Sequence, residues 1–143
     1  TIYQEDVFFR VAEGRLKLRI FSDTSGELIH YERPDVPGCK ESRYQIVETP
    51  KPRATRQLLA AALGETVVVK KRREVILAGQ TRIHLDEVEG LGSFMELEVV
   101  LQPGQSASDG EDVATDLMNQ LGIKEADLVM GAYADLLVQD CNK

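Results

Sequence analysis

The sequence has little cysteine and no long apolar run. Its two cysteines, Cys39 and Cys141, lie far apart, and no CxxC or Cys/His spacing accompanies them. This argues against a zinc site and a disulfide framework, and it favours a reducing compartment. No apolar run approaches the length of about 20 residues that spans a bilayer, and no signal peptide opens the chain. We therefore expect a cytoplasmic protein without a membrane partner.

Several catalytic motifs are also absent. The sequence has no GxGxxG and no P-loop lysine motif, and its serines lack a nucleophile-elbow context. His30 and His84 are the only histidines, which argues against a Ser/His triad. His84, close to Asp86 in sequence, is open to a role as general base, although a structural histidine on a strand is the stronger expectation.

The charge is divided unevenly along the chain. The formal net charge is -7, but residues 1–75 hold 14 Lys/Arg and 11 Asp/Glu, whereas residues 76–143 hold 3 and 13. Because the chain is acidic and does not interleave aromatic with basic residues, we expect no nucleic-acid partner. The basic residues are concentrated in segments that have the composition of strands.

Length and periodicity indicate one α+β domain over residues 1–143. Alternation and tight turns predict strands at 2–10, 15–22, 27–33, 42–49, 66–78, 80–89 and 93–101. Residues 53–63 predict a helix that ends at Gly64. A second helix is expected from a cap at Ser108 or Asp109 to about residue 121, followed by Gly122, and a third over 125–138. So many short strands favour a barrel or a strongly curved sheet.

The strand faces carry an unusual pattern of charge. Residues i and i+2 of a strand share a face. The sets on single faces are Arg15, Lys17 and Arg19; Lys70 and Arg72, with Lys71 and Arg73 opposite; Arg82, His84 and Asp86; and Glu96 and Glu98. Taken strand by strand, solvated faces with cross-strand ion pairs explain the charges. Taken together, they favour a barrel with a polar interior.

Such an interior suits a polyanion and a divalent metal. Several cations that face one another need an anion between them, and phosphate oxygens bind Arg as a planar fork and Lys as a point charge. Glu96 and Glu98 lie about 7 Å apart along one strand face. With Asp86 from a neighbouring strand, they are predicted to hold Mg²⁺ or Mn²⁺. Phosphoryl or nucleotidyl transfer is the expected chemistry.

The motifs QEDVFF, GRLKLR, LIHYERPD, VVKKRREV, TRIHLDEVEGLGSFMELEVVL and AYADLL resemble the CYTH superfamily, the triphosphate tunnel metalloenzymes. The likeness is strongest to class IV adenylate cyclases (CyaB-like), and thiamine triphosphatases belong to the same superfamily. The resemblance implies an antiparallel eight-stranded barrel with flanking helices around a hydrophilic tunnel. It makes a homodimer an expectation for the assembly.

The resemblance also implies roles for individual residues. The expected phosphate-binding set is Arg15, Lys17, Arg19, Arg33, Lys70 and Arg72, and the expected metal-binding set is Asp86, Glu96 and Glu98. Arg82 is expected to face the substrate in the catalytic region. The family's first-strand Glu-x-Glu-x-Lys motif has no counterpart, because TIYQED resembles the family's second strand. We therefore expect that the first strand and the following helix are missing from this chain.

The favoured function is hydrolysis of tripolyphosphate or an organic triphosphate such as thiamine triphosphate, by a metal-activated water. The first alternative is a class IV adenylate cyclase that converts ATP to cyclic AMP and pyrophosphate. The second is a non-catalytic module that binds polyphosphate or a nucleotide. Loss of the first-strand motif favours this module, whereas the carboxylates at Asp86, Glu96 and Glu98 argue against it.

Overall fold

A computed structural model describes residues 1–32 and 43–128 of the protein. The elements are β1 (Ile2–Phe9), β2 (Arg15–Ser22), β3 (Ser25–Glu32), β4 (Arg43–Thr49), α1 (Pro52–Leu63), β5 (Glu65–Ala78), β6 (Thr81–Val88), β7 (Gly92–Val99), α2 (Ala107–Leu121) and a short 3₁₀ helix, η1 (Glu125–Asp127). The predicted strands are confirmed to within two residues at each end. Most of the helix predicted over 125–138 lies outside the described residues.

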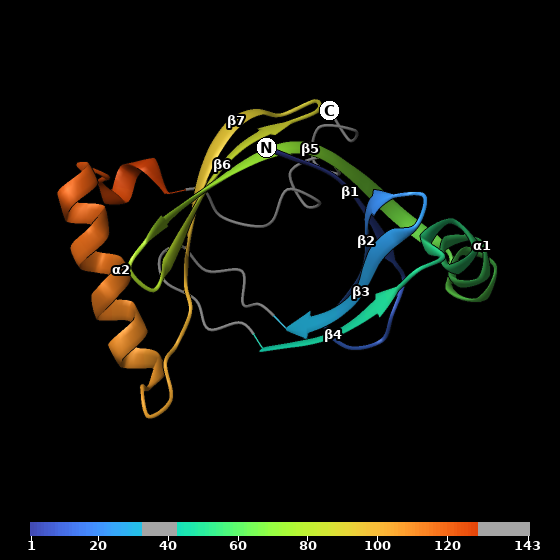
Figure 1. Ribbon diagram of the computed structural model, residues 1–143, viewed down its shortest axis with the longest axis horizontal. Helices are drawn as coiled ribbons and strands as arrows, with labels where there is room; N and C mark the ends of the chain where they lie inside the picture. Colours follow the sequence, from blue (N-terminus) through green and yellow to red (C-terminus); the bar gives the residue numbers. More distant parts are fainter. Residues whose placement is uncertain (33–42, 129–143) are drawn as a thin grey trace.

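The strands form one antiparallel sheet of seven strands, in the order β4-β3-β2-β1-β5-β6-β7. The sheet bends into an arc, with α1 outside the arc at one side and α2 at the other (Figure 1). Among the described residues β4 and β7 are the two edges and do not pair, so the sheet is not closed there. The curved antiparallel sheet is confirmed, and closure into an eight-stranded barrel stays a prediction.

The outer face of the sheet packs against α1. Val7 and Leu18 are fully buried in a core cluster on this face, and Leu59 and Ala60 of the helix pack against the cluster. Gly26 of β3 lies under the start of the helix, where an added Cβ would come within 2.9 Å of the Pro52 ring. Alternate apolar residues of β1 and β2 therefore face α1, and the residues between them face the concave side of the sheet.

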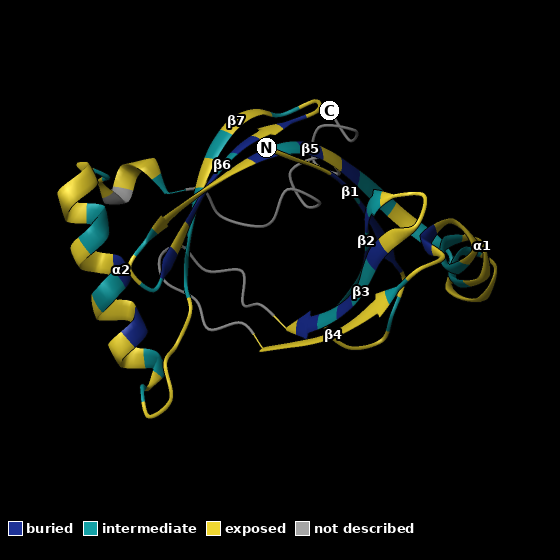
Figure 2. Ribbon diagram, in the orientation of Figure 1, coloured by how far each residue is buried: buried dark blue, intermediate teal, exposed yellow. Residues whose placement is uncertain are grey.

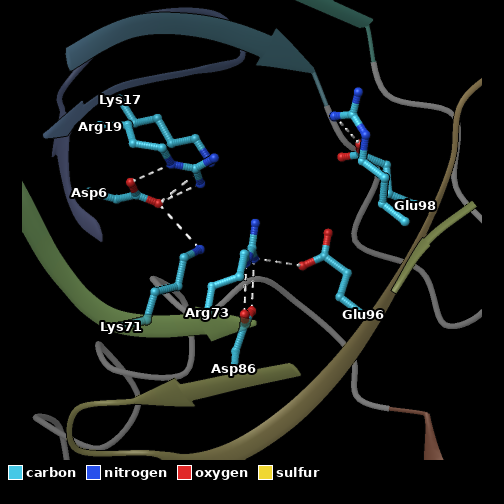
Figure 3. A network of polar contacts seen from close by, with 9 residues as sticks. Asp6, Lys17, Arg19, Lys71, Arg73, Asp86, Glu96 and Glu98 are labelled. Carbon is cyan, nitrogen blue, oxygen red and sulfur yellow. Dashed lines mark hydrogen bonds and ion pairs between the residues drawn. The ribbon is translucent and has the colours of Figure 1, made fainter. Parts of the chain in front are cut away.

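Buried residues are concentrated in β1, β2, β3, β5 and β6, whereas β4 is largely exposed (Figure 2). The concave side, here called the inner face, carries most of the buried charge (Figure 3). Cross-strand partners in an antiparallel sheet share a face, so Asp6, paired with Arg19 and Val69, places all three on this side. A smaller apolar cluster, built on Phe8, Val69 and Val88, lies beside the charges. Polar residues therefore occupy a position where a two-layer sheet would bury apolar ones.

The helix ends combine predicted and unpredicted features. Gly64 ends α1 with φ +82°, and Gly122 ends α2 with φ +73°, both as predicted. The cap of α2 was predicted wrongly, because Ser106 is the cap, and its hydroxyl and the Asp109 carboxylate each accept the other residue's backbone N–H. Among the described residues, no helix is long and apolar enough to cross a membrane.

Candidate phosphate-binding site on the inner face

Three cations converge on the buried carboxylate of Asp6 (Figure 3). Arg19 donates from Nε and Nη2 to the two oxygens of Asp6, each at 2.8 Å. The Nζ atoms of Lys17 and Lys71 lie 3.7 and 3.5 Å from Asp6 Oδ2. Asp6 is only 2% exposed. This group of four residues, here called the Asp6 cluster, therefore holds three cations and one anion out of bulk water.

The pairing of three strands builds the Asp6 cluster. Asp6 on β1 is the cross-strand partner of Arg19 on β2, and Gln4, two residues earlier, is the partner of Lys71 on β5. Lys17 reaches the cluster from beside Phe8, and its Nζ lies 5.8 Å from that ring centroid. β1, between the two basic strands, thus brings one carboxylate within reach of both.

A second ion pair lies further along β5. Arg73 donates from Nε and Nη2 to the two oxygens of its cross-strand partner Asp86, at 2.7 and 2.8 Å. Arg73 Nη2 also lies 3.6 Å from Glu96 Oε2. Arg82 Nη1 donates to Glu98 Oε1 at 3.2 Å. Carboxylates thus outnumber cations toward β7, whereas cations outnumber carboxylates around Asp6 (Figure 3).

The charges of the Asp6 cluster shift one another's proton affinity. Burial alone would raise the pKa of Asp6, but Lys17, Arg19 and Lys71 outweigh it and hold that pKa far below its usual range. Burial, opposed by Asp6 and assisted by Arg19 and Lys71, lowers the pKa of Lys17 to about 7. Burial also lowers the pKa of Lys71. Near neutral pH, Lys17 is therefore poised between its charged and neutral forms.

The titration of Lys17 predicts a pH-dependent affinity for polyanions. Lys17 is protonated below about pH 7 and loses its charge above it. A bound polyphosphate favours the charged form, so its affinity should fall between pH 7 and 9, by up to about tenfold per unit. Calorimetric titration with tripolyphosphate at several pH values tests this. Lys17→Arg is the control, because the guanidinium group stays charged over this range. In that variant, only the titration of tripolyphosphate itself changes the affinity with pH. Equal pH slopes in the two proteins would contradict the prediction.

The inner face brings together most of the residues predicted from sequence. Lys17 and Arg19 lie in the Asp6 cluster. Arg15 lies on the same face, where it is the cross-strand partner of Tyr31. Register and contacts also place on this face the residues predicted on β6 and β7, namely Arg82, Asp86, Glu96 and Glu98. Arg33 lies outside the described residues.

The predicted pair on β5 requires a correction. Lys70 and Arg72 lie on the outer face, where Lys70 is exposed and Arg72 pairs with Glu87 at 2.9 Å. Their neighbours Lys71 and Arg73 face inward and are 7% and 5% exposed. The physical reason is the register with β1 and β6, since a period of two allows only one of the two pairs to face Asp6.

Two inner-face residues escaped sequence reasoning altogether. Asp6 lies in the strand IYQEDVFF, and because Val7 and Phe9 point to the outer face, alternation places Asp6 on the inner face. Gln4 is 7% exposed, and its Oε1 finds no hydrogen-bond partner among the described residues. A carboxylate in phase with Gln4 and Phe8, on a strand next to the basic strand of residues 15–19, is the signal that could have revealed Asp6.

The predicted metal site fits only in part. Both oxygens of Asp86 are bound by Arg73, so Asp86 serves as a partner for that guanidinium rather than as an open ligand. Within residues 1–32 and 43–128, no group of three or more His, Cys, Asp or Glu side chains is arranged to hold a metal. Glu96 and Glu98 remain as two inner-face carboxylates. That number suits Mg²⁺, which takes one or two carboxylates and completes its shell with water and substrate phosphates.

His84 lies on the inner face opposite Glu96. Burial and the nearby Arg73 lower its pKa, so the imidazole is neutral at physiological pH. Its Nδ1 is buried and finds no hydrogen-bond partner in the described part of the chain. A buried ring nitrogen of this kind, donor or acceptor according to the tautomer, calls for a water or a ligand group.

Comparison with known proteins supports the same reading of the fold. A 24% identical Pyrococcus horikoshii protein of known structure, PH1012, superposes with a TM-score of 0.83 over 94% of this chain and 82% of its own. The adenylate cyclase CyaB of Aeromonas hydrophila is 25% identical over 90% of this chain and 65% of its own length. A Methanocaldococcus jannaschii protein with a provisional adenylate cyclase name is 22% identical over 94% of this chain and 81% of its own. The CYTH domain profile matches residues 1–133, and the chain therefore belongs to the CYTH domain family.

Proposed function

We propose that the Asp6 cluster binds the phosphates of a triphosphate substrate. One observation carries the proposal: Lys17, Arg19 and Lys71 converge on one buried carboxylate, so three basic side chains lie close together around Asp6. Buried like charges are costly unless an anion joins them. Phosphate groups supply that anion, with oxygens for the Arg19 fork and for two ammonium groups.

The substrate would lie with its phosphates along β1, β2 and β5 and extend toward β7. Glu96 and Glu98 would hold Mg²⁺ or Mn²⁺ at that end, where the ion would neutralise charge on the phosphates. Arg73 would remain paired with Asp86 while its guanidinium faces the same space (Figure 3). Arg82, paired with Glu98, would help to fix that carboxylate.

Two reactions suit this arrangement. In ATP cyclisation, the ribose 3′-hydroxyl loses its proton, its oxygen bonds to the α-phosphorus, and pyrophosphate leaves. The adenylate cyclase names of two relatives support this reaction. In hydrolysis, the oxygen of water bonds to the terminal phosphorus, the bond from that phosphorus to the bridging oxygen breaks, the diphosphate portion leaves, and orthophosphate is released. The charged residues of the inner face support this second candidate, because hydrolysis asks only for contacts to phosphates and for carboxylates.

A product assay separates these reactions. The protein is incubated with Mg²⁺ or Mn²⁺ and, separately, ATP, thiamine triphosphate and tripolyphosphate. Cyclic AMP with pyrophosphate would establish the cyclase, and orthophosphate the hydrolase. Binding without turnover would favour the non-catalytic module. If calorimetry detects no binding of any of the three compounds, the triphosphate proposal is wrong.

Replacing Glu96 and Glu98 with Gln tests the metal-binding role. We expect metal-dependent turnover to fall by about 10- to 100-fold or more, on the scale of losses at perturbed metal sites. Binding of tripolyphosphate without metal should persist, because the Asp6 cluster is intact. Glu87→Gln, on the outer face and paired with Arg72, is the matched control. Unchanged turnover in the double variant would refute the assignment.

A further inference from the structure

An exposed aromatic and apolar surface adjoins the Asp6 cluster on the inner face. The rings of Tyr31 and Tyr44 lie with centroids 5.7 Å apart at an interplanar angle of 37°. Tyr31 is 4% exposed, whereas Tyr44 is 51% exposed and Ile46 54% exposed. We call Tyr31, Tyr44 and Ile46 the aromatic patch. The exposed side chains of Tyr44 and Ile46, unlike the buried apolar cluster around Phe8, offer a surface to an apolar partner.

The register shows that the aromatic patch and the cations share one face. Tyr44 on β4 is the cross-strand partner of Tyr31 on β3, and Ile46 is the partner of Ile29. Ile29 is in turn the partner of Lys17 on β2. The aromatic patch therefore continues the row of residues that leads to the Asp6 cluster.

Lys17 joins the two regions directly. Its Nζ lies 5.0 Å from the centroid of the Tyr31 ring and 3.7 Å from Asp6 Oδ2. A phosphate bound by Lys17 would therefore lie beside the aromatic patch. On the inner face, the cations of the Asp6 cluster therefore lie on the β5 side and the aromatic patch lies on the β4 side.

We propose that the aromatic patch binds the planar ring of an organic triphosphate, with the exposed face of Tyr44 as the stacking surface and Ile46 beside it. This inference rests on the proposed function, because it assumes that the phosphates lie on the Asp6 cluster. The Tyr31 ring packs beside that of Tyr44 and contacts the Lys17 ammonium group on its other neighbour strand. The substrate class is thereby narrowed to triphosphates that carry an aromatic ring, such as a nucleoside triphosphate, in preference to inorganic tripolyphosphate.

Calorimetric titration of ATP and tripolyphosphate, without metal, tests the proposal. Tyr44→Ala should weaken ATP binding by at least about fivefold, the lower end of measured base–aromatic stacking. Tripolyphosphate affinity should stay within about twofold of the wild-type value, and Tyr44→Phe should keep ATP affinity. Tyr3→Ala is the matched control, because Tyr3 is 68% exposed on the outer face.

Each other outcome has a distinct meaning. If the wild-type protein binds neither compound, the proposed function fails. If it binds both and Tyr44→Ala changes neither affinity, or weakens both equally, the aromatic patch is not a ring site although the phosphate site stands. If Tyr44→Ala dissociates a dimer and leaves ATP affinity unchanged, a second copy covers the aromatic patch and the inference is overturned.

Discussion

Replacing Lys71 with Met should weaken tripolyphosphate binding by about 10- to 150-fold, the range expected for a lost hydrogen bond to a charged group. Lys71 contributes one of the three cations around Asp6, and its Nζ lies on the inner face. Lys70→Met removes the same charge one residue earlier, on the outer face, and should change affinity by less than about threefold, because exposed charges are screened. Calorimetry at one ionic strength measures both effects.

The next two residues of β5 provide a second matched pair. Arg73→Lys keeps a positive charge for Asp86 but loses the two-point geometry, so it should weaken binding. Arg72→Lys, on the outer face, should have little effect. An equal loss for Lys70→Met and Lys71→Met would show that net charge alone governs binding, and it would contradict the assigned inner face.

Asp6→Asn should destabilise the protein in the absence of a polyanion. The carboxylate is 2% exposed and contacts three cations, and removing one partner from such a buried group costs about 3–5 kcal/mol. Urea unfolding measures the loss. Asp23→Asn is the control, because the Asp23 side chain is 88% exposed and pairs only with Arg53 among the contacts seen here; its effect should stay within about 0.5 kcal/mol.

Tripolyphosphate should restore more stability to Asp6→Asn than to the wild-type protein, because the added anion takes the place of the missing carboxylate. Acid should destabilise the wild-type protein. The pKa of Asp6 is lower in the folded chain than in the unfolded chain, so its stabilisation is complete above the unfolded value and is lost as pH falls toward the folded one. This part of the acid sensitivity should be absent from Asp6→Asn. An unchanged urea midpoint for Asp6→Asn would refute the account of Asp6.

The strands were predictable because alternation and turn residues are local features. The range 15–22 is predicted as observed, and the others differ by one or two residues at their ends. Closure of the sheet was not predictable from such local features, because it depends on whether the two edge strands, which are far apart in sequence, pair with each other. The cap at Ser106 was missed because its reciprocal contact with Asp109 is visible only once the loop geometry is known.

Which cations of β5 face inward could not be predicted from the sequence. Residues 70–73 are four consecutive cations, so each face of the strand receives two of them. Local alternation cannot choose between the faces; the choice comes from pairing with Gln4 on β1 and Asp86 on β6. Asp6 was missed for a related reason, because its role depends on Arg19 lying opposite it. In β2, by contrast, alternation with buried Leu18 fixes the face of Lys17 and Arg19 directly.

The central claim is that a triphosphate binds between the cations on the inner face. The most direct measurement is ¹⁵N NMR of the lysine Nζ groups during a titration with tripolyphosphate, with signals assigned by single Lys→Arg variants. We expect the signals of Lys17 and Lys71 to shift together and saturate, while that of Lys70 stays in place. A saturating shift of Lys70, with Lys17 and Lys71 unmoved, would place the ligand on the outer face and contradict the account.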